Sequence, residues 1–132
     1  MTNGMNTAVT KGVEITVHTQ FREDLSSIEN SQFFFNYRVV LENQNDFDIQ
    51  LMSRDWYIFD SLSAPNFVSG EGVVGEQPVI KPGERYTYVS GSELFSELGL
   101  MKGFYTFQNL ETKDSFQARI PTFSLIYPNR MN

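Results

Sequence analysis

The sequence GEGVVGEQPVIKPGERYTYVSG, residues 70–91, decides the fold of this chain. Its first six residues carry glycines at the spacing GxGxxG, and glycine frees the backbone from the constraints of a Cβ atom. A dinucleotide-binding motif needs a helix that begins inside it, so that the helix N-terminus holds the pyrophosphate. Here Pro78 and Pro82 fall within that would-be helix, where an interior proline costs roughly 3 kcal/mol. No Gly-Lys-Ser/Thr ending forms a P-loop either. The motif therefore predicts a rigid, sharply turned loop between strands.

Alternating apolar residues on both sides of this loop predict β-strands. The strongest pattern occupies residues 32–42, and its apolar face consists of Phe33, Phe35, Tyr37, Val39 and Leu41. Residues 13–17 alternate in the same way, and residues 81–84, KPGE, have the pattern of a type II turn. Short strands separated by turn signals predict an all-β fold, an antiparallel β-sandwich of about seven to nine strands.

Two local features refine this expectation. Odd positions are apolar up to Leu51 and even positions are apolar from Trp56 onward. Because a slip of one residue exchanges the two faces of a strand, a β-bulge or bend is predicted within residues 52–55. Residues 92–98 begin with a serine suited to an N-cap and carry leucines four positions apart, which predicts a short helix.

Four motifs in order along the chain point to a known family. Residues 50–56 read QLMSRDW, residues 70–91 contain the glycine loop, residues 101–105 read MKGFY and residues 120–125 read IPTFSL. Together they resemble the ApaG family, which has QLxxRxW, MxGxY and IPxFxL at these places. The resemblance extends over residues 9–128 and implies a fibronectin type III-like or immunoglobulin-like sandwich. Residues 92–98 depart from the small-residue loop of the family.

The resemblance implies two classes of function, because the family has no established biochemical activity. Related domains occur within larger eukaryotic proteins, including an F-box ubiquitin-ligase subunit and a polymerase-interacting protein, which implies a protein-interaction module. Stand-alone bacterial relatives have been associated with cobalt resistance and magnesium efflux, and with diphosphate or nucleotide binding. They imply the alternative, a small-ligand regulator linked to divalent cations.

Composition favours one globular domain in the cytoplasm. The chain has 132 residues, 40% of them hydrophobic, no cysteine and a net charge of −6. That charge disfavours nonspecific nucleic-acid binding, which needs clustered Lys and Arg. No apolar run approaches the length of a membrane span, and residues 1–11 lack a signal-peptide core. We expect residues 1–11 to be a flexible segment and residues 12–128 to form the sandwich domain.

Few residues have the arrangement that catalysis or metal binding needs. His18 is the sole histidine and lies on the predicted outer face of a strand, no serine stands in a GxSxG motif, and Asp46 and Asp48 lack a calcium-loop pattern. The sequence therefore predicts a protein that is not an enzyme and has neither a catalytic residue, a metal site nor a cofactor.

Two segments are candidates for binding. Arg54 and Trp56 would share a strand face as a recognition pair; alternatively Trp56 packs in the core, and Arg54 pairs with a carboxylate or caps the bend. The second candidate is the glycine loop, whose residues Gly70, Gly72, Val73, Val74 and Gly75 would bind a protein partner or, through a nest of N–H groups, a diphosphate or nucleotide. We expect the loop to be a conformational device first, with a positive φ or a close backbone approach at one or more glycines.

Overall fold

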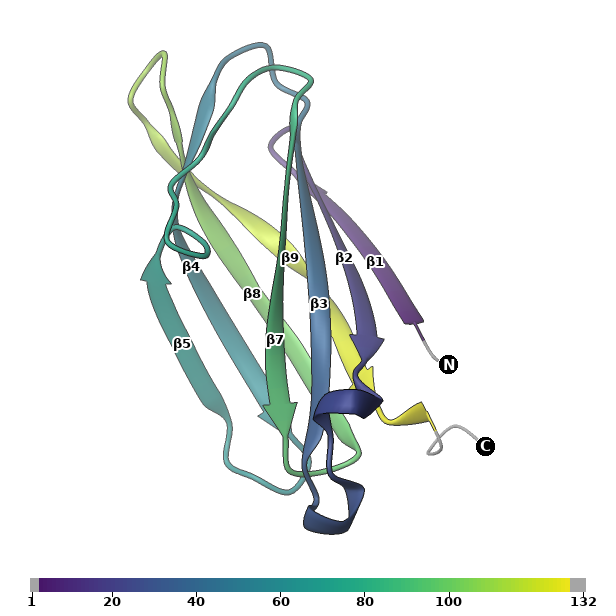
Figure 1. Cartoon of the computed structure of the whole chain (residues 1–132). Helices are drawn as coiled ribbons and strands as arrows, with labels where there is room; N and C mark the ends of the chain where they lie inside the picture. Colours follow the sequence, from purple (N-terminus) through teal and green to yellow (C-terminus); the bar gives the residue numbers. More distant parts are fainter. Residues whose placement is uncertain (1–2, 129–132) are drawn as a thin grey trace.

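The computed structural model describes residues 3–128, which form nine strands in two antiparallel sheets (Figure 1). The strands are β1 (Asn3–Thr10), β2 (Val13–Phe21), β3 (Phe33–Asn43), β4 (Ile49–Asp60), β5 (Asn66–Glu71), β6 (Val79–Ile80), β7 (Arg85–Leu94), β8 (Leu98–Asn109) and β9 (Ser115–Ile126). The first sheet has the order β1-β2-β3-β7, and the second has the order β5-β4-β8-β9, with β6 also paired to β4. The predicted all-β antiparallel sandwich is confirmed.

The core lies between the sheets because inward and outward residues alternate along each strand. In β3 the predicted face is buried throughout: Phe33, Phe35, Tyr37, Val39 and Leu41. Trp56 of β4 sits at the centre of the core, with its ring 5.4 Å from that of Tyr37 and 5.9 Å from that of Phe123. Since Tyr37 belongs to the first sheet and Phe123 to the second, this aromatic contact joins the two layers.

The two sides of the sandwich differ. On the closed side, β9 packs against β1 and β2, and the backbone N–H of Arg119 donates to Thr10 Oγ1. On the open side, β5 and β7 are edge strands: within the described residues, β5 pairs only with β4 and β7 only with β3 (Figure 1).

The predicted irregularity in β4 is present. Pairing between β4 and β8 shifts register between Leu51 and Ser53, inside the interval where the apolar positions change parity. The shift leaves Leu51 and Trp56 both buried although they are an odd number of residues apart. The turn at residues 81–84 also has its predicted form, with Gly83 at a φ of 78° and a hydrogen bond of 2.9 Å from Glu84 N to Lys81 O.

Two predictions of local structure were wrong. In the predicted flexible segment, residues 1 and 2 lie outside the described part, residues 3–10 form β1, which pairs with β2 along its whole length, and Lys11 begins the turn to β2. The predicted helix at residues 92–98 is instead the end of β7, a turn at residues 95–97 and the start of β8. Leu94 is buried opposite Phe33, and Asp60 accepts hydrogen bonds from Phe95 N and Ser96 Oγ. Strand pairing in the folded structure therefore outweighs the weak helical preference suggested by the spacing of the leucines.

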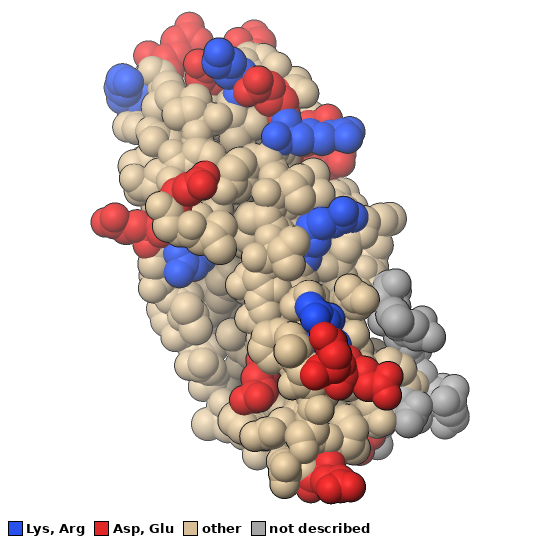
Figure 2. Space-filling view, in the orientation of Figure 1, with Lys and Arg blue, Asp and Glu red and all other residues tan. Residues whose placement is uncertain are grey.

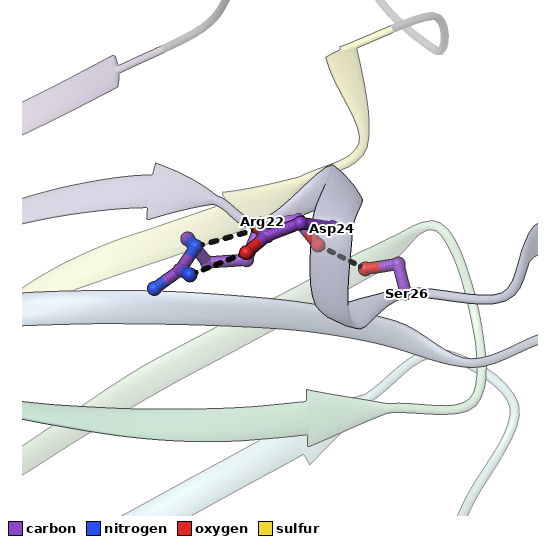
Figure 3. A network of polar contacts seen from close by, with 3 residues as sticks. All are labelled: Arg22, Asp24 and Ser26. Carbon is purple, nitrogen blue, oxygen red and sulfur yellow. Dashed lines mark hydrogen bonds and ion pairs between the residues drawn. The ribbon is translucent and has the colours of Figure 1, made fainter.

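The connection from β2 to β3 contains two short 3-10 helices, η1 (Glu23–Leu25) and η2 (Ile28–Asn30), and local polar contacts hold it in place (Figure 3). Arg22 donates two hydrogen bonds to the carboxylate of Asp24, at 2.8 and 2.6 Å. Ser26 Oγ donates to Arg22 O at 2.7 Å and accepts from Phe34 N at 2.9 Å. This side-chain hydroxyl links the connection to the start of β3.

Candidate functional site

The glycine loop forms a tight hairpin, which we call the glycine hairpin and define as residues 72–77. Val73 and Glu76 exchange backbone hydrogen bonds of 2.8 and 2.9 Å, and the two residues between them, Val74 and Gly75, have φ values of 43° and 79°. Two successive positive φ values identify a type I′ turn, the two-residue turn that matches the twist of paired strands. The predicted sharp turn is therefore present.

Glycine is required at the base of the hairpin. Gly72 has a φ of 58°, and a Cβ there would lie 1.9 Å from the carbonyl oxygen of Glu76. Gly75 also has a positive φ, but a Cβ on it would meet no atom within 4 Å. At Gly70 a Cβ would lie 3.0 Å from the guanidinium of Arg54. The expectation of positive φ and close approach within this loop is confirmed.

Arg54 fastens the hairpin to the body of the domain. Its Nη1 donates to Glu71 O at 3.0 Å and to Gly72 O at 2.7 Å. The carbonyl of Met52 accepts a hydrogen bond from each strand of the hairpin. Gly72 N donates to it at 2.9 Å from the first strand, and Gln77 Nε2 donates to it at 2.9 Å from the second. Because Met52 is the residue at the register shift, the β4 irregularity supplies the acceptor that anchors the hairpin.

Arg54 and Trp56 have separate roles. Trp56 is 3% exposed and lies in the core, which confirms the alternative in which its ring packs internally. Arg54 caps the loop through backbone carbonyls, so the two side chains offer no joint surface. A role for Arg54 in binding a partner stays a prediction.

Buried tyrosines lie behind Arg54 on the open side. The hydroxyls of Tyr88 and Tyr105 form a short hydrogen bond with each other. Burial raises the pKa of Tyr37, Tyr88 and Tyr105 above the usual value for tyrosine, and the positive charge of Arg54 opposes part of this rise. These hydroxyls are therefore neutral donors and acceptors at physiological pH.

Val74 is the most unusual residue of the site. Its neighbour Val73 is 1% exposed, whereas Val74 at the hairpin tip is 62% exposed. A positive φ is rare for a β-branched residue, because its Cβ substituents crowd the backbone. The sequence predicted the turn but not this valine, since Asn-Gly is the usual pair in such a turn.

The other residues considered from the sequence are not gathered into a site. His18 lies on β2 between Met5 of β1 and Arg38 of β3. Within residues 3–128, no group of three or more His, Cys, Asp or Glu side chains is placed to hold a metal ion, and no helix has the length and apolarity to span a membrane. In the view of Figure 2 the Lys and Arg side chains are scattered, while Asp and Glu lie mainly toward the two ends.

Comparisons with known proteins agree with this architecture. Residues 23–109 match the model of the ApaG domain family. The chain belongs to the ApaG family. It is 44% identical to Protein ApaG of Methylobacterium radiotolerans over 95% of both chains, and 43% identical to Protein ApaG of Beijerinckia indica over 94% of this chain and 95% of the relative.

A solved structure of the family has the same fold. The crystal structure of the putative ApaA protein from Bordetella pertussis superposes with a TM-score of 0.84 at 33% identity, covering 88% of this chain and 94% of that one. The resemblance inferred from four sequence motifs is thus confirmed for this ApaG-family chain.

Proposed function

We propose that this ApaG-family chain is a non-enzymatic module that binds a protein partner through the glycine hairpin. The observation that carries the proposal is Val74, an exposed β-branched residue at a φ of 43°. Unfavourable backbone conformations of this kind are kept where the surrounding structure imposes them, and they cluster at functional sites. Asparagine would occupy the same turn position with less strain, so the presence of valine favours a role for its apolar side chain.

The anchoring of the hairpin supports this proposal. Arg54 and Gln77 tie its two strands to β4, so Val74 has a fixed position before a partner arrives. Binding through a preorganised segment avoids part of the entropy that ordering a loop would cost. An exposed apolar side chain on a rigid tip suits insertion into a pocket of another protein.

The alternative of a diphosphate or nucleotide site has less support. The N–H groups of Gly72, Val73 and Glu76 all donate to carbonyls of the protein, whereas an anion nest needs N–H groups that are free to converge on the ligand. Glu71 immediately precedes the hairpin and Glu76 lies within it, and their carboxylates would repel a phosphate. A divalent cation does not explain why a valine occupies the tip.

Replacement of Val74 separates a binding role from a structural one. Val74→Asn should raise the free energy of unfolding by about 1 kcal/mol, because asparagine tolerates a positive φ better than valine does. The same variant should capture a lysate partner roughly tenfold less efficiently, the loss expected for about 1.4 kcal/mol of contact energy. Urea denaturation and quantitative affinity capture with immobilised protein measure the two effects.

Val89→Asn is the matched control. Val89 is 52% exposed on β7, away from the hairpin, so its replacement should leave capture unchanged. Equal capture by the parent and Val74→Asn would contradict the proposal, as would equal losses in both variants.

A further inference from the structure

Aromatic side chains gather on the outer face of the second sheet, where an exposed sheet face normally carries polar residues. Tyr57 of β4 is 39% exposed and Phe67 of β5 is 51% exposed, and the two are paired across the strands with ring centroids 4.8 Å apart. Phe59 lies two residues from Tyr57 on the same side of β4, and Phe104 of β8 pairs with Asp55 on that side as well. We call these four aromatic residues the aromatic face.

Two cations border this face. Lys102 pairs with Tyr57 across the sheet, and its Nζ lies 5.7 Å from the centre of the Phe59 ring. Arg119 of β9 pairs with Phe104. Within residues 3–128 neither Lys102 nor Arg119 forms an ion pair, although the whole chain has a net charge of −6. The one carboxylate on this side of β4, that of Asp55, accepts a hydrogen bond from Ser69 Oγ at 2.9 Å, so within the described residues the two cations lie beside the aromatic rings without an ion-pair partner.

The cations and two of the aromatics line one shallow pocket of about 360 Å³. Its walls include Tyr57, Phe104, Lys102 and Arg119, together with Thr10 and Gln117. No acidic side chain is among the residues that line it. A ligand in this pocket would meet two positive charges and two ring surfaces, a combination that suits a carboxylate next to an apolar group.

We propose that this pocket and the adjoining aromatic face bind an acidic peptide segment of a protein partner. Carboxylates of the segment would pair with Lys102 and Arg119, and an apolar side chain would pack on Tyr57 and Phe104. The aromatic face continues past the pocket to Phe67 on β5, so it offers contact area that a free small anion would leave uncovered. The inference rests on the proposed function, since it names the chemistry of the protein partner, but it concerns a different surface from the glycine hairpin.

Direct binding tests the chemistry of this site. The probe is a pool of nine-residue peptides with a central Phe flanked by Asp and Glu, and its control is the same pool with Asn and Gln in place of the acids. Added to ¹⁵N-labelled full-length protein, the acidic pool should shift the amide resonances of Lys102, Phe104 and Arg119 to saturation. The neutral pool should bind on the order of tenfold more weakly, because it lacks the charges that complement the two cations.

Charge reversal tests the residues. Lys102→Glu combined with Arg119→Glu should weaken binding of the acidic pool by on the order of tenfold or more. The matched control, Arg38→Glu combined with Lys81→Glu, makes the same change in net charge at exposed positions outside the pocket and should retain binding within about twofold. Because all four side chains are exposed, both double variants should keep the far-UV circular dichroism of the parent.

Four outcomes would overturn the proposal. The first is equal binding of the two peptide pools, and the second is an equal loss of binding in the two double variants. The third is saturation of the same resonances by benzoate alone with the affinity of the peptides, and the fourth is self-association of the protein that Lys102→Glu combined with Arg119→Glu abolishes. The first two would remove the site, the third would assign it to a free small anion and the fourth to a second copy of this chain. Val74→Asn should bind the acidic pool as the parent does. Failure of the peptide-binding test therefore leaves the proposal for the glycine hairpin standing, and failure of the hairpin test leaves the proposal for the aromatic face standing.

Discussion

The closed and open sides of the sandwich hold their shape by different forces. On the closed side, β2 buries Val13, Ile15 and Val17 completely and packs against β9, so apolar burial seals the layers. On the open side, the hydroxyls of Tyr88 of β7 and Tyr105 of β8 bond to each other across the two sheets, and a hydrogen bond from Arg54 to Gly72 O fixes the glycine hairpin. Apolar contacts tolerate small rearrangements, whereas directional bonds specify one position for an exposed segment. The open side is therefore the side on which a rigid binding element is built.

The largest effect on folding stability should come from replacing Trp56, which lies in the core between the closed and open sides. Trp56→Ala should lower the free energy of unfolding by about 3–5 kcal/mol, since it removes a buried indole that contacts Tyr37 and Phe123. Chemical denaturation monitored by circular dichroism measures the change. An unchanged unfolding midpoint accompanied by lost partner binding would instead assign Trp56 to an interaction surface.

A smaller effect should separate two glycines of the hairpin. Gly72→Ala should cost about 2–4 kcal/mol, because its Cβ would overlap the Glu76 carbonyl at a positive φ. Gly75→Ala should cost only about 1 kcal/mol, since open space surrounds that position. Thermal melts with and without pyrophosphate provide the measurement. If pyrophosphate stabilised the parent but not Gly72→Ala, while their ligand-free midpoints agreed, the loop would be an anion site first and a structural device second.

The smallest expected effect is a loss of folding stability at high pH, caused by the buried tyrosines of the open side. Burial raises the folded-state pKa of Tyr88 and Tyr105, so folding favours their protonated forms. Their contribution to stability is fully present below pH 10, the unfolded pKa, and is lost as the pH rises from there toward the folded pKa. The expected slope is up to about 1.4 kcal/mol per pH unit for each tyrosine, measured by urea denaturation between pH 8 and 11.

Replacing the tyrosines identifies the source of that slope. The double variant Tyr88→Phe and Tyr105→Phe removes both partners of a buried hydrogen bond, so it should be nearly neutral at pH 7 and have a flatter slope above pH 10. Tyr88→Phe alone should cost about 1–3 kcal/mol at pH 7, because it removes the Tyr88 hydroxyl and leaves the fully buried Tyr105 hydroxyl without this hydrogen-bond partner. A double variant with the slope of the parent would show that other groups titrate.

Strand patterns were predictable where one face of a strand is buried. The alternation in residues 33–41 and the change of parity before Trp56 both follow from the two-residue period of a strand, and the structure confirms both. β1 was missed because its residues NGMNTAVT have no apolar alternation; its pairing with β2 along the backbone holds it in place. The turn after β7 was mistaken for a helix because Leu94 and Leu98 happen to be four residues apart while flanking a turn.

The sequence by itself determined the all-β class, the family, the core of β3, the β4 irregularity and the need for glycine in residues 70–75, because each depends on local periodicity or on one residue's φ preference. Only the tertiary structure decided that Arg54 bonds the hairpin carbonyls, that Val74 is exposed while Val73 is buried, and that Lys102 and Arg119 border one aromatic face. These facts depend on which strands become neighbours. Strand pairing brings together residues that are far apart in the chain, and the spacing of residues along the sequence does not show which strands will pair.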